Sequence, residues 1–414
     1  MGLHAAGLIR GITMLIVQKY GGSSVADAGK IARVAGIIAE AYRAGNAVVV
    51  VLSAQGDTTD ELIEKAKEIN PKPSKREMDV LLTVGEQISV ALMAMELEKR
   101  RLPAVSLTGW QIGMRTDANH GASRIRSVST ERIRRELDQN RVVLVAGFQG
   151  IDRYGDITTL GRGGSDTTAV AIAAALGADK CQIYTDVDGV YTADPRIVPN
   201  AGKLDAITYD EMLELASLGS QVLHNRSVEL AKRYHVELEV LSSYERKPGT
   251  KVREVTEKVE RMIVSGVAKD AHIARITVAG LPESPDAAFR VFSVMARAKI
   301  NVDIILQSAA RDGRTDISFT VAEDDAEEAG AALEQARPAL GCDHISVDRD
   351  VAKVSVVGAG MMNTSGMAVR MFEALAGAHI GIQMISSSEI KLSAVIARAD
   401  ADRAVQAVHE KYFG

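Results

Sequence analysis

Charged and small residues gather in one short stretch of the chain, Thr159 to Ala169, which reads TLGRGGSDTTA. Its glycines permit backbone angles that other residues avoid, and Ser165 can cap a helix that begins just after it. Loop amides and a helix amino terminus together form a site suited to anions. Arg162 could hold a carboxylate with its two-pronged guanidinium, and Asp166 could hold an ammonium group. The pattern favours an amino acid as ligand, with a capped glycine turn as the alternative.

A second glycine pair follows a lysine in KYGGSS, Lys19 to Ser24, between an expected strand and an expected helix. Glycines let phosphate oxygens approach backbone amides, and Lys19 would place a positive charge on a transferring phosphoryl group. A tight turn with an exposed lysine is the alternative. The segment does not fit GxxxxGK[ST], and the chain has no HRD or DFG set, which disfavours an ordinary P-loop enzyme or protein kinase.

A third stretch, Tyr184 to Arg196, crowds Asp186, Asp188 and Asp194 into a loop after an expected strand. Acidic side chains near phosphates could orient nucleotide hydroxyls or a magnesium ion, and an Asx-rich surface turn explains the same pattern. The sequence leaves these two interpretations open. The GxG of VVGAGMMN, Val356 to Asn363, predicts a tight turn because Asn363 occupies the sixth position of the dinucleotide fingerprint.

Composition limits the class of protein. The 414 residues predict two or three domains, and a net charge of -5 without a basic block argues against nucleic acid as a partner. Only two cysteines occur, Cys181 and Cys342, which indicates a reducing compartment without a disulfide framework or zinc site. The apolar run in the amino terminus is too short for a membrane span, and the segment lacks a signal-peptide layout. We therefore expect no membrane association and a cytoplasmic location.

The elements that must position these loops alternate between strand and helix patterns from residue 14 to about 255, after an amino-terminal extension at 1–13. Buried β-branched runs between amphipathic helices predict an α/β fold with a mainly parallel sheet between helices. Two similar α+β repeats follow, at 272–349 and 350–414. The second lacks a final strand, which RMIVSGVA at 261–268 could supply, so we expect the first repeat to be inserted within the second.

Six motifs in order carry a resemblance to a known family: KYGGSS, SAQGDTTDEL, LLTVGEQIS, GFQG, TLGRGGSDTTA and TDVDGVYTADPR. The chain after Met14 resembles the monofunctional aspartokinases, which have the amino-acid kinase fold, and its two repeats resemble their ferredoxin-like ACT regulatory domains. The resemblance implies ATP with Mg²⁺ as cofactors and L-aspartate as substrate. It implies the first step of lysine, threonine and methionine biosynthesis.

The resemblance also assigns site residues, with Lys19, Arg162 and Asp166 as the catalytic ones. The implied aspartate site consists of Thr59, Glu86, Phe148, Arg162, Gly163, Gly164, Ser165 and Asp166. The implied nucleotide site consists of Lys19, Tyr20, Gly21, Gly22, Ser53, Thr185, Asp186, Tyr191, Asp194 and Arg196. Asn301, Asp303 and Gln307 are the implied effector residues, and no side chain is assigned as a metal ligand. Gln221 replaces a lysine common in relatives, whose role Lys232 or Lys251 could take.

Other functions stay open at this point. The same fold could phosphorylate glutamate, carbamate or a nucleoside monophosphate, although paired acids beside Arg162 disfavour the last two. A non-catalytic amino-acid sensor is disfavoured because Lys19, Arg162 and Asp166 occur together. The effector could be lysine, threonine or both. The resemblance further implies a homodimer or higher oligomer formed through the ACT domains.

Overall fold

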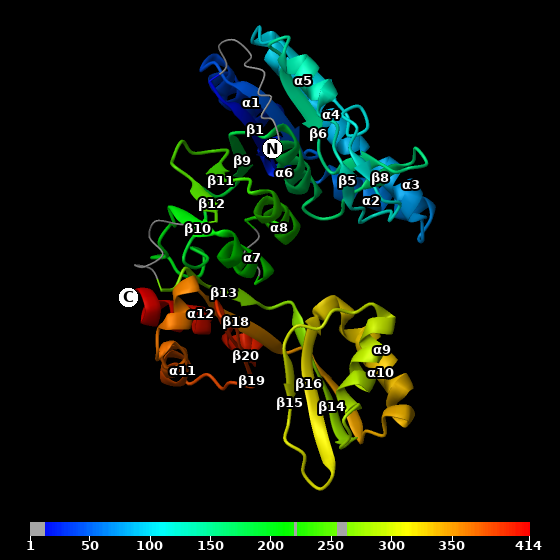
Figure 1. The fold of residues 1–414 in the computed structure, drawn as a ribbon, viewed down its shortest axis with the longest axis vertical. Coiled ribbons are helices and arrows are strands. Elements are labelled where there is room, and N and C mark those ends of the chain that lie inside the picture. Colours follow the sequence, from blue (N-terminus) through cyan, green and yellow to red (C-terminus); the bar gives the residue numbers. More distant parts are fainter. Residues whose placement is uncertain (1–12, 219–221, 255–262) are drawn as a thin grey trace, which may run out of the picture. The chain divides into compact units, whose positions relative to one another are not determined.

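A computed structural model describes residues 13–218, 222–254 and 263–414 of the chain (Figure 1). The predicted amino-terminal extension, apart from Thr13, and Gln221 lie outside these ranges. The chain divides into two compact units. The first contains residues up to 190, 203–216 and 221–256, and the second contains 191–202, 217–220 and 257–414. Each unit is described by itself.

The first unit is built on an eight-stranded sheet of order β10-β12-β11-β9-β1-β2-β6-β3. Its strands are β1 (Leu15–Tyr20), β2 (Ala47–Leu52), β3 (Ala104–Leu107), β6 (Val142–Ala146), β9 (Lys180–Thr185), β10 (Ala206–Thr208), β11 (Leu238–Ser242) and β12 (Thr250–Arg253). All neighbouring pairs are parallel except β11 with β12. The expected mainly parallel α/β sheet is confirmed.

Helices cover the central strands on both faces, which explains why β2, with the sequence AVVVVL, is buried along its whole length. Alternate residues of β2, such as Val48 and Val50, share a hydrophobic core with α1 (Ala28–Arg43) and α4 (Val84–Lys99). On the other face lies α6 (Gly164–Leu176), which contacts β1, β2 and β9. The remaining helices of the first unit are α2 (Thr58–Ile69), α3 (Lys75–Leu82), α5 (Glu131–Leu137), α7 (Tyr209–Ser217) and α8 (Asn225–Tyr234).

The stretch formed by α3 and α4, Lys75 to Lys99, is long and apolar enough to pass a composition test for a membrane span, as the core helix of a globular domain also can. In this structure α4 packs against α1, β3 and β6. Its apolar character extends to exposed positions one helical turn apart, Val84, Ile88 and Leu92. Because α4 packs against a helix and two strands of the main sheet, we interpret this stretch as part of the helical layer of the first unit.

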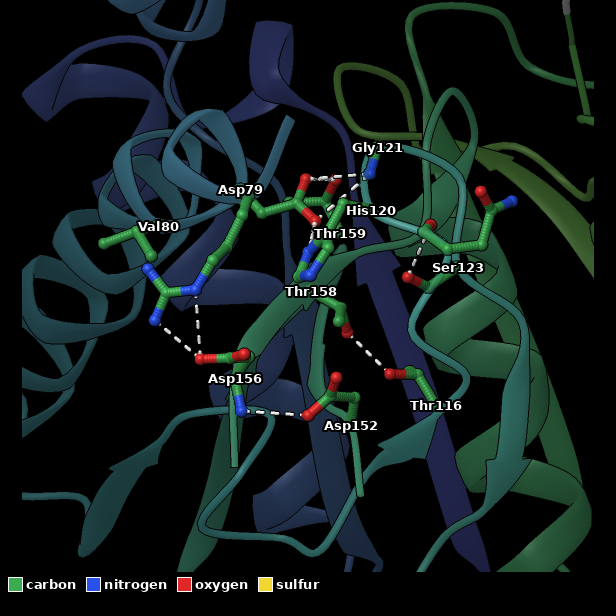
Figure 2. A network of polar contacts seen from close by, with 12 residues as sticks. Asp79, Val80, Thr116, His120, Gly121, Ser123, Asp152, Asp156, Thr158 and Thr159 are labelled. Atoms are coloured by element: carbon green, nitrogen blue, oxygen red, sulfur yellow. Dashed lines mark hydrogen bonds and ion pairs between the residues drawn. The ribbon is translucent and has the colours of Figure 1, made fainter. Parts of the chain in front are cut away.

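A small sheet of order β5-β4-β7-β8 stands beside the main one, made of β4 (Arg115–Thr116), β5 (Ile125–Ser127), β7 (Gln149–Ile151) and β8 (Ile157–Thr159). The buried carboxylate of Asp79 joins it to α3 (Figure 2). Asp79 accepts hydrogen bonds from the Thr159 hydroxyl at 2.5 Å and from the Gly121 amide at 3.0 Å. It also lies 2.9 Å from Nδ1 of His120. One side chain thus fixes a helix, a strand and a loop.

The second unit contains two antiparallel sheets, of order β13-β18-β20-β19 and β15-β16-β14-β17. Their strands are β13 (Gly266–Asp270), β14 (Ile273–Pro282), β15 (Ile305–Gln307), β16 (Arg314–Ala322), β17 (His344–Asp348), β18 (Val351–Val357), β19 (Met384–Ser387) and β20 (Lys391–Ala397). The helices α9 (Ala287–Ala298) and α10 (Ala326–Leu340) belong to the first repeat, and α11 (Met367–Gly377) and α12 (Ala401–Phe413) to the second. Both repeats have the expected ferredoxin-like α+β content.

The sheet of the second repeat takes its edge strand from ahead of the first repeat. Gly266 to Asp270 pair antiparallel with Lys353 to Val357. The sequence predicted this strand at 261–268, of which 261 and 262 lie outside the described residues. Because β13 and β18 flank the whole first repeat, that repeat interrupts the second in the chain.

One segment between β9 and β10, residues 191–202, belongs to the second unit although it was expected within a kinase domain that runs to residue 255. Thr192 accepts from the Val267 amide at 2.7 Å, and its hydroxyl lies 2.9 Å from Nε2 of His409. Val198 joins the hydrophobic core of β18 and α12. These partners are distant in sequence, so local patterns carry no sign of them.

Replacing Asp79 with alanine is expected to destabilise the first unit strongly. The Gly121 amide, the Thr159 hydroxyl and His120 would each lose an acceptor, and an unsatisfied buried donor costs about 1–3 kcal/mol. We expect the free energy of unfolding to fall by at least about 3 kcal/mol in urea titrations. Glu64→Ala, at an exposed position of α2, is the control and should change it by less than about 0.5 kcal/mol. Equal stability of the two variants would contradict the assignment.

Candidate active site

The carboxyl ends of the parallel strands bring the predicted loops to one edge of the sheet. Lys19 pairs in register with Val51 of β2 and Ile183 of β9, so the residues that follow these strands lie beside it. Ser53 follows β2 directly, and Thr185 ends β9. Ligands of open α/β sheets bind at this edge, because the loops from neighbouring strands converge there.

An ion pair joins the two glycine-rich loops. Nζ of Lys19 lies 2.6 Å from Oδ1 of Asp166, and both side chains are nearly buried, 13% and 12% exposed. Asp166 stands in the first turn of α6, where the positive end of the helix dipole favours a carboxylate. The loop at Lys19 to Ser24, which the sequence suggests for phosphate, therefore meets the stretch at Thr159 to Ala169, which it suggests for an amino acid.

Backbone packing at the start of α6 leaves no room for larger residues. A Cβ on Gly147 would lie 2.6 Å from the Ser165 hydroxyl, and one on Gly164 would lie 2.8 Å from Cδ2 of Phe148. Phe148 has a positive φ of 70°, a strained conformation for a residue with a side chain. Its carbonyl accepts from the Leu160 amide at 2.8 Å. Phe148, Gly164 and Ser165 thus pack closely together at the start of α6, and their role in a substrate site stays a prediction.

The turn after β1 is equally tight. A Cβ on Gly22 would lie 2.6 Å from the Ala54 carbonyl oxygen, and one on Gly21 would lie 3.6 Å from Nζ of Lys19. The Gly56 amide donates to the Gly22 carbonyl at 3.1 Å. The loops after β1 and β2 therefore pack backbone to backbone, with Gly21 close to the lysine ammonium group.

Glu86 is a buried acid in the first turn of α4 with only 4% of its surface exposed. Its Oε1 accepts from the Ala54 amide at 3.1 Å, while Oε2 is buried and has no hydrogen-bond partner in the part of the chain that the structure describes. Burial penalises the charged form and raises the pKa of Glu86 to about 7. Thr59, in the first turn of α2, is partly buried. An unpaired buried carboxylate oxygen is suited to a cationic group of a ligand.

Other predicted residues of the first unit have different surroundings. Arg162 is exposed and forms no ion pair with any residue that the structure describes. Tyr20 is fully buried and stacks on Tyr184 with ring centroids 4.6 Å apart, so its side chain serves packing. Asp186 is exposed and accepts from the Thr185 hydroxyl at 3.0 Å.

The predicted nucleotide residues Tyr191, Asp194 and Arg196 lie in the segment assigned to the second unit. The guanidinium of Arg196 binds the Asp194 carboxylate through Nη2 at 2.7 Å, and this contact holds the pKa of Asp194 below its usual value. The assignment of these three residues to the nucleotide site stays a prediction. Of the two lysines considered in place of the one missing at position 221, Lys232 pairs with Asp210 at 2.6 Å and Lys251 lies in β12.

Two residues that were not predicted from the sequence support the loop from Leu160 to Gly163, which contains Arg162 and which we call the arginine loop. Arg226 donates from Nη1 to the Leu160 carbonyl at 2.7 Å and from Nη2 to the Ser123 carbonyl at 2.6 Å. A Cβ on Gly163, whose φ is 66°, would lie 2.2 Å from Cγ of His224. Both residues come from the start of α8, far from the loop in sequence, and no local motif marks them.

The predicted effector residues lie between α9 and the end of β15 in the second unit. Asn301, Asp303 and Gln307 are all exposed. The carboxylate of Asp303 binds the ammonium group of Lys353, which is buried in β18. This ion pair joins the two repeats, a role that the sequence did not predict.

Comparisons with known proteins agree with this geometry. Residues 14–242 match the model of the amino acid kinase family, and residues 276–336 and 354–412 match an ACT domain model. The aspartokinase of Mycolicibacterium smegmatis is 51% identical over 403 residues, 96% of each chain. That of Bacillus sp. (strain MGA3) is 50% identical over 398 residues, 96% of this chain and 97% of its own.

Solved structures show the same likeness. The structure of E. coli aspartokinase III in complex with aspartate and ADP is 26% identical and covers 97% of this chain and 100% of its own, with a TM-score of 0.80. The same enzyme in complex with lysine and aspartate is 28% identical over the same shares, with a TM-score of 0.76. On the family model and the full-length identity, the chain belongs to the amino acid kinase family and, within it, to the aspartokinases.

Proposed function

We propose that this chain transfers the γ-phosphoryl group of ATP to the side-chain carboxylate of L-aspartate, which forms 4-phospho-L-aspartate and ADP. This is the first step towards lysine, threonine and methionine. The observation that supports the proposal is the contact of Lys19 with Asp166, because it joins the loop after β1 to the start of α6. The E. coli relative bound to aspartate and ADP supports the same pair of ligands.

Aspartate would be held by charges of opposite sign. Arg162, exposed at the loop before α6, would take a carboxylate through two parallel hydrogen bonds. Glu86 and Asp166 would take the ammonium group, which would give the unpaired Oε2 of Glu86 a partner. Phe148 and the Gly163 to Ser165 backbone would line the pocket, and Thr59 would border it. Glutamate, longer by one methylene, would place its carboxylate differently and react poorly.

No general base is needed for the transfer, because a carboxylate is already ionised at neutral pH. Its oxygen attacks the γ-phosphorus, a new oxygen–phosphorus bond forms, and the bond to the ADP oxygen breaks. Lys19 would neutralise charge on the transferring group, with the glycine amides after β1 as further donors. When Lys19 contacts the phosphoryl group, the substrate ammonium group would replace it as the partner of Asp166. Neither Lys19 nor Asp166 would then stay unpaired.

The residues at the ends of β2 and β9 suit the nucleotide. Ser53, Thr185 and Asp186 offer oxygen donors at the strand ends beside Lys19, and oxygen is the ligand atom that Mg²⁺ prefers. Bound with ATP, Mg²⁺ supplies charge neutralisation on the phosphates. Tyr20 would contact the nucleotide through its backbone only, because its side chain is buried. On the family resemblance, Tyr191, Asp194 and Arg196 would also contact the nucleotide.

Regulation would act through the second unit. Asn301, Asp303 and Gln307 are exposed and could bind an effector amino acid such as lysine or threonine, and the E. coli relative is known in complex with lysine. The edge strands β15 and β19 expose Ile305, Leu306 and Ile385, which supports pairing of ACT sheets between subunits and at least a homodimer. Both cysteines are free and buried, which fits a cytoplasmic location.

ADP release with a panel of amino acids tests the proposal. We expect turnover with L-aspartate and little with glutamate. Lys19→Ala should keep the fold by circular dichroism and lower kcat about a hundredfold, roughly 3 kcal/mol, while aspartate affinity changes less. Lys180→Ala, exposed at the opposite end of β9, is the control and should be nearly normal. ADP release without aspartate dependence, or normal turnover of Lys19→Ala, would refute the mechanism.

Aspartate affinity should rise with pH through neutrality. With a pKa of about 7, Glu86 is about one-tenth ionised at pH 6 and mostly ionised at pH 8, and only the ionised form attracts an ammonium group. Calorimetric titration should give about tenfold tighter binding at pH 8. Glu86→Gln should bind more weakly at pH 8 and lose most of this dependence.

In the free enzyme, Glu86 contributes stability below pH about 4.3 that is lost as pH rises to about 7, because the raised pKa favours the protonated folded form. If the aspartate affinity of Glu86→Gln kept the same pH dependence, the dependence would belong to another group.

Asp303→Ala should abolish inhibition by lysine or threonine while uninhibited turnover stays nearly intact. Effector binding must favour a less active kinase conformation by about 1–3 kcal/mol. Because Asp303 also pairs with Lys353, Asn301→Ala serves as a second variant that leaves this ion pair in place. Glu327→Ala, exposed on α10, is the control. Inhibition curves that coincide for the wild type and both effector variants would remove these residues from the effector site.

A further inference from the structure

A group of potential metal ligands lies in the first unit, outside the proposed active-site residues. His120, Asp152 and Asp156 each offer one ligand atom, and these atoms all lie within 4.8 Å of one another. They come from two segments, the loop between β4 and β5 and the turn between β7 and β8. Figure 2 shows the two aspartates beneath His120.

Asp152 has an oxygen that the protein leaves without a partner. The residue is 1% exposed, and its Oδ1 accepts from the amides of Tyr154 at 2.8 Å and Asp156 at 2.9 Å. Its Oδ2 is buried and has no hydrogen-bond partner among the described residues. A carboxylate oxygen removed from water without compensation is costly, so a ligand at this position would relieve the penalty.

His120 contacts a buried carboxylate through one ring nitrogen, as metal-binding histidines commonly do. Its Nδ1 lies 2.9 Å from Oδ2 of Asp79, a buried carboxylate that can only accept when ionised. With the proton on Nδ1, Nε2 keeps its lone pair free for a metal. Carboxylate, histidine and metal in this order are a common arrangement, in which the carboxylate fixes the tautomer and the ring.

The local charge fits a divalent cation. Three carboxyl groups gather here, those of Asp79, Asp152 and Asp156, and one of them is paired with a cation, since Nη2 of Arg76 lies 2.6 Å from Oδ1 of Asp156. The group is not sealed, because the side chains of His120 and Asp156 are 19% and 32% exposed. Water could therefore reach the ion and complete its coordination.

We propose that His120, Asp152 and Asp156 bind one divalent first-row transition-metal ion, of which Zn²⁺ is the type. One imidazole nitrogen with two carboxylate oxygens suits Zn²⁺ better than Mg²⁺, which prefers oxygen ligands and octahedral geometry. At tetrahedral angles, bonds of about 2.0–2.2 Å place two donors on one ion about 3.4 Å apart. The ligand atoms, which lie within 4.8 Å of one another, would therefore move closer by up to about 1.4 Å when the ion binds.

The bound ion would stabilise the support of the arginine loop. Asp79 already ties His120 to Thr159 at the end of β8, and the chain continues from there to Gly161 and Arg162. The ion would add a direct link between the His120 loop and the β7–β8 turn. Its role in this arrangement is structural, and the phosphoryl transfer does not use it.

Zinc titration of the nucleotide-free, tag-free chain after chelator treatment tests the proposal. Calorimetry should show one equivalent of Zn²⁺ bound, and Zn²⁺ should raise the unfolding temperature of the wild type. Asp152→Asn keeps Oδ1 for the two turn amides and replaces the unpaired oxygen. It should bind Zn²⁺ at least about tenfold more weakly and lose the thermal shift. Mg²⁺ at the same concentration should give no comparable shift.

Two further variants separate the site from general effects. His120→Gln can still donate to Asp79 and should also lose Zn²⁺ binding, which covers the case in which Asp152→Asn does not fold. Asp60→Asn, an exposed carboxylate on α2, is the control and should bind like the wild type. Absence of stoichiometric Zn²⁺ binding, or equal affinity in the wild type and both ligand variants, would overturn the proposal and leave a water molecule as the partner of Asp152. Neither result would bear on ADP release.

Discussion

The ion pair between Lys19 and Asp166 is the interaction on which the site depends. Two charges held 2.6 Å apart and largely removed from water need each other, because separating them would leave each buried and unpaired. The pair draws the end of β1 towards the start of α6. A substrate ammonium group can take the place of Lys19 beside Asp166, and a phosphoryl group can take the place of Asp166 beside Lys19. Substrates can therefore enter without leaving either side chain unpaired.

The backbone around this pair has little freedom. Gly147, Gly164 and Gly22 all stand where a Cβ would lie 2.8 Å or less from a neighbouring atom, so the loops approach as closely as main chains can. Phe148 accepts a strained φ of 70° to reach its place. Such packing keeps amides and charges in position before any ligand arrives, which is the condition for electrostatic catalysis.

The second unit shows how regulation can be built into chain topology. Its two repeats are interlocked through β13 and linked by the contact of Asp303 with Lys353. Residues 191–202, which leave and re-enter the first unit at Val190 and Lys203, are packed within this unit. A change in the repeats could therefore reach the end of β9, and with it Asp186, along the chain itself.

The sequence by itself determined the fold class, the alternation of strands with helices and the positions of the glycine-rich loops, because these depend on local periodicity and glycine placement. It also indicated that β13 completes the second repeat, since an unfinished sheet needs an edge. Only the tertiary structure decided that Lys19 meets Asp166, that Glu86 is buried enough for a pKa of about 7, and that Arg226 supports the arginine loop. It likewise placed residues 191–202 with the repeats. These features arise from contacts between residues far apart in the chain, and burial and distance have no signature in local sequence.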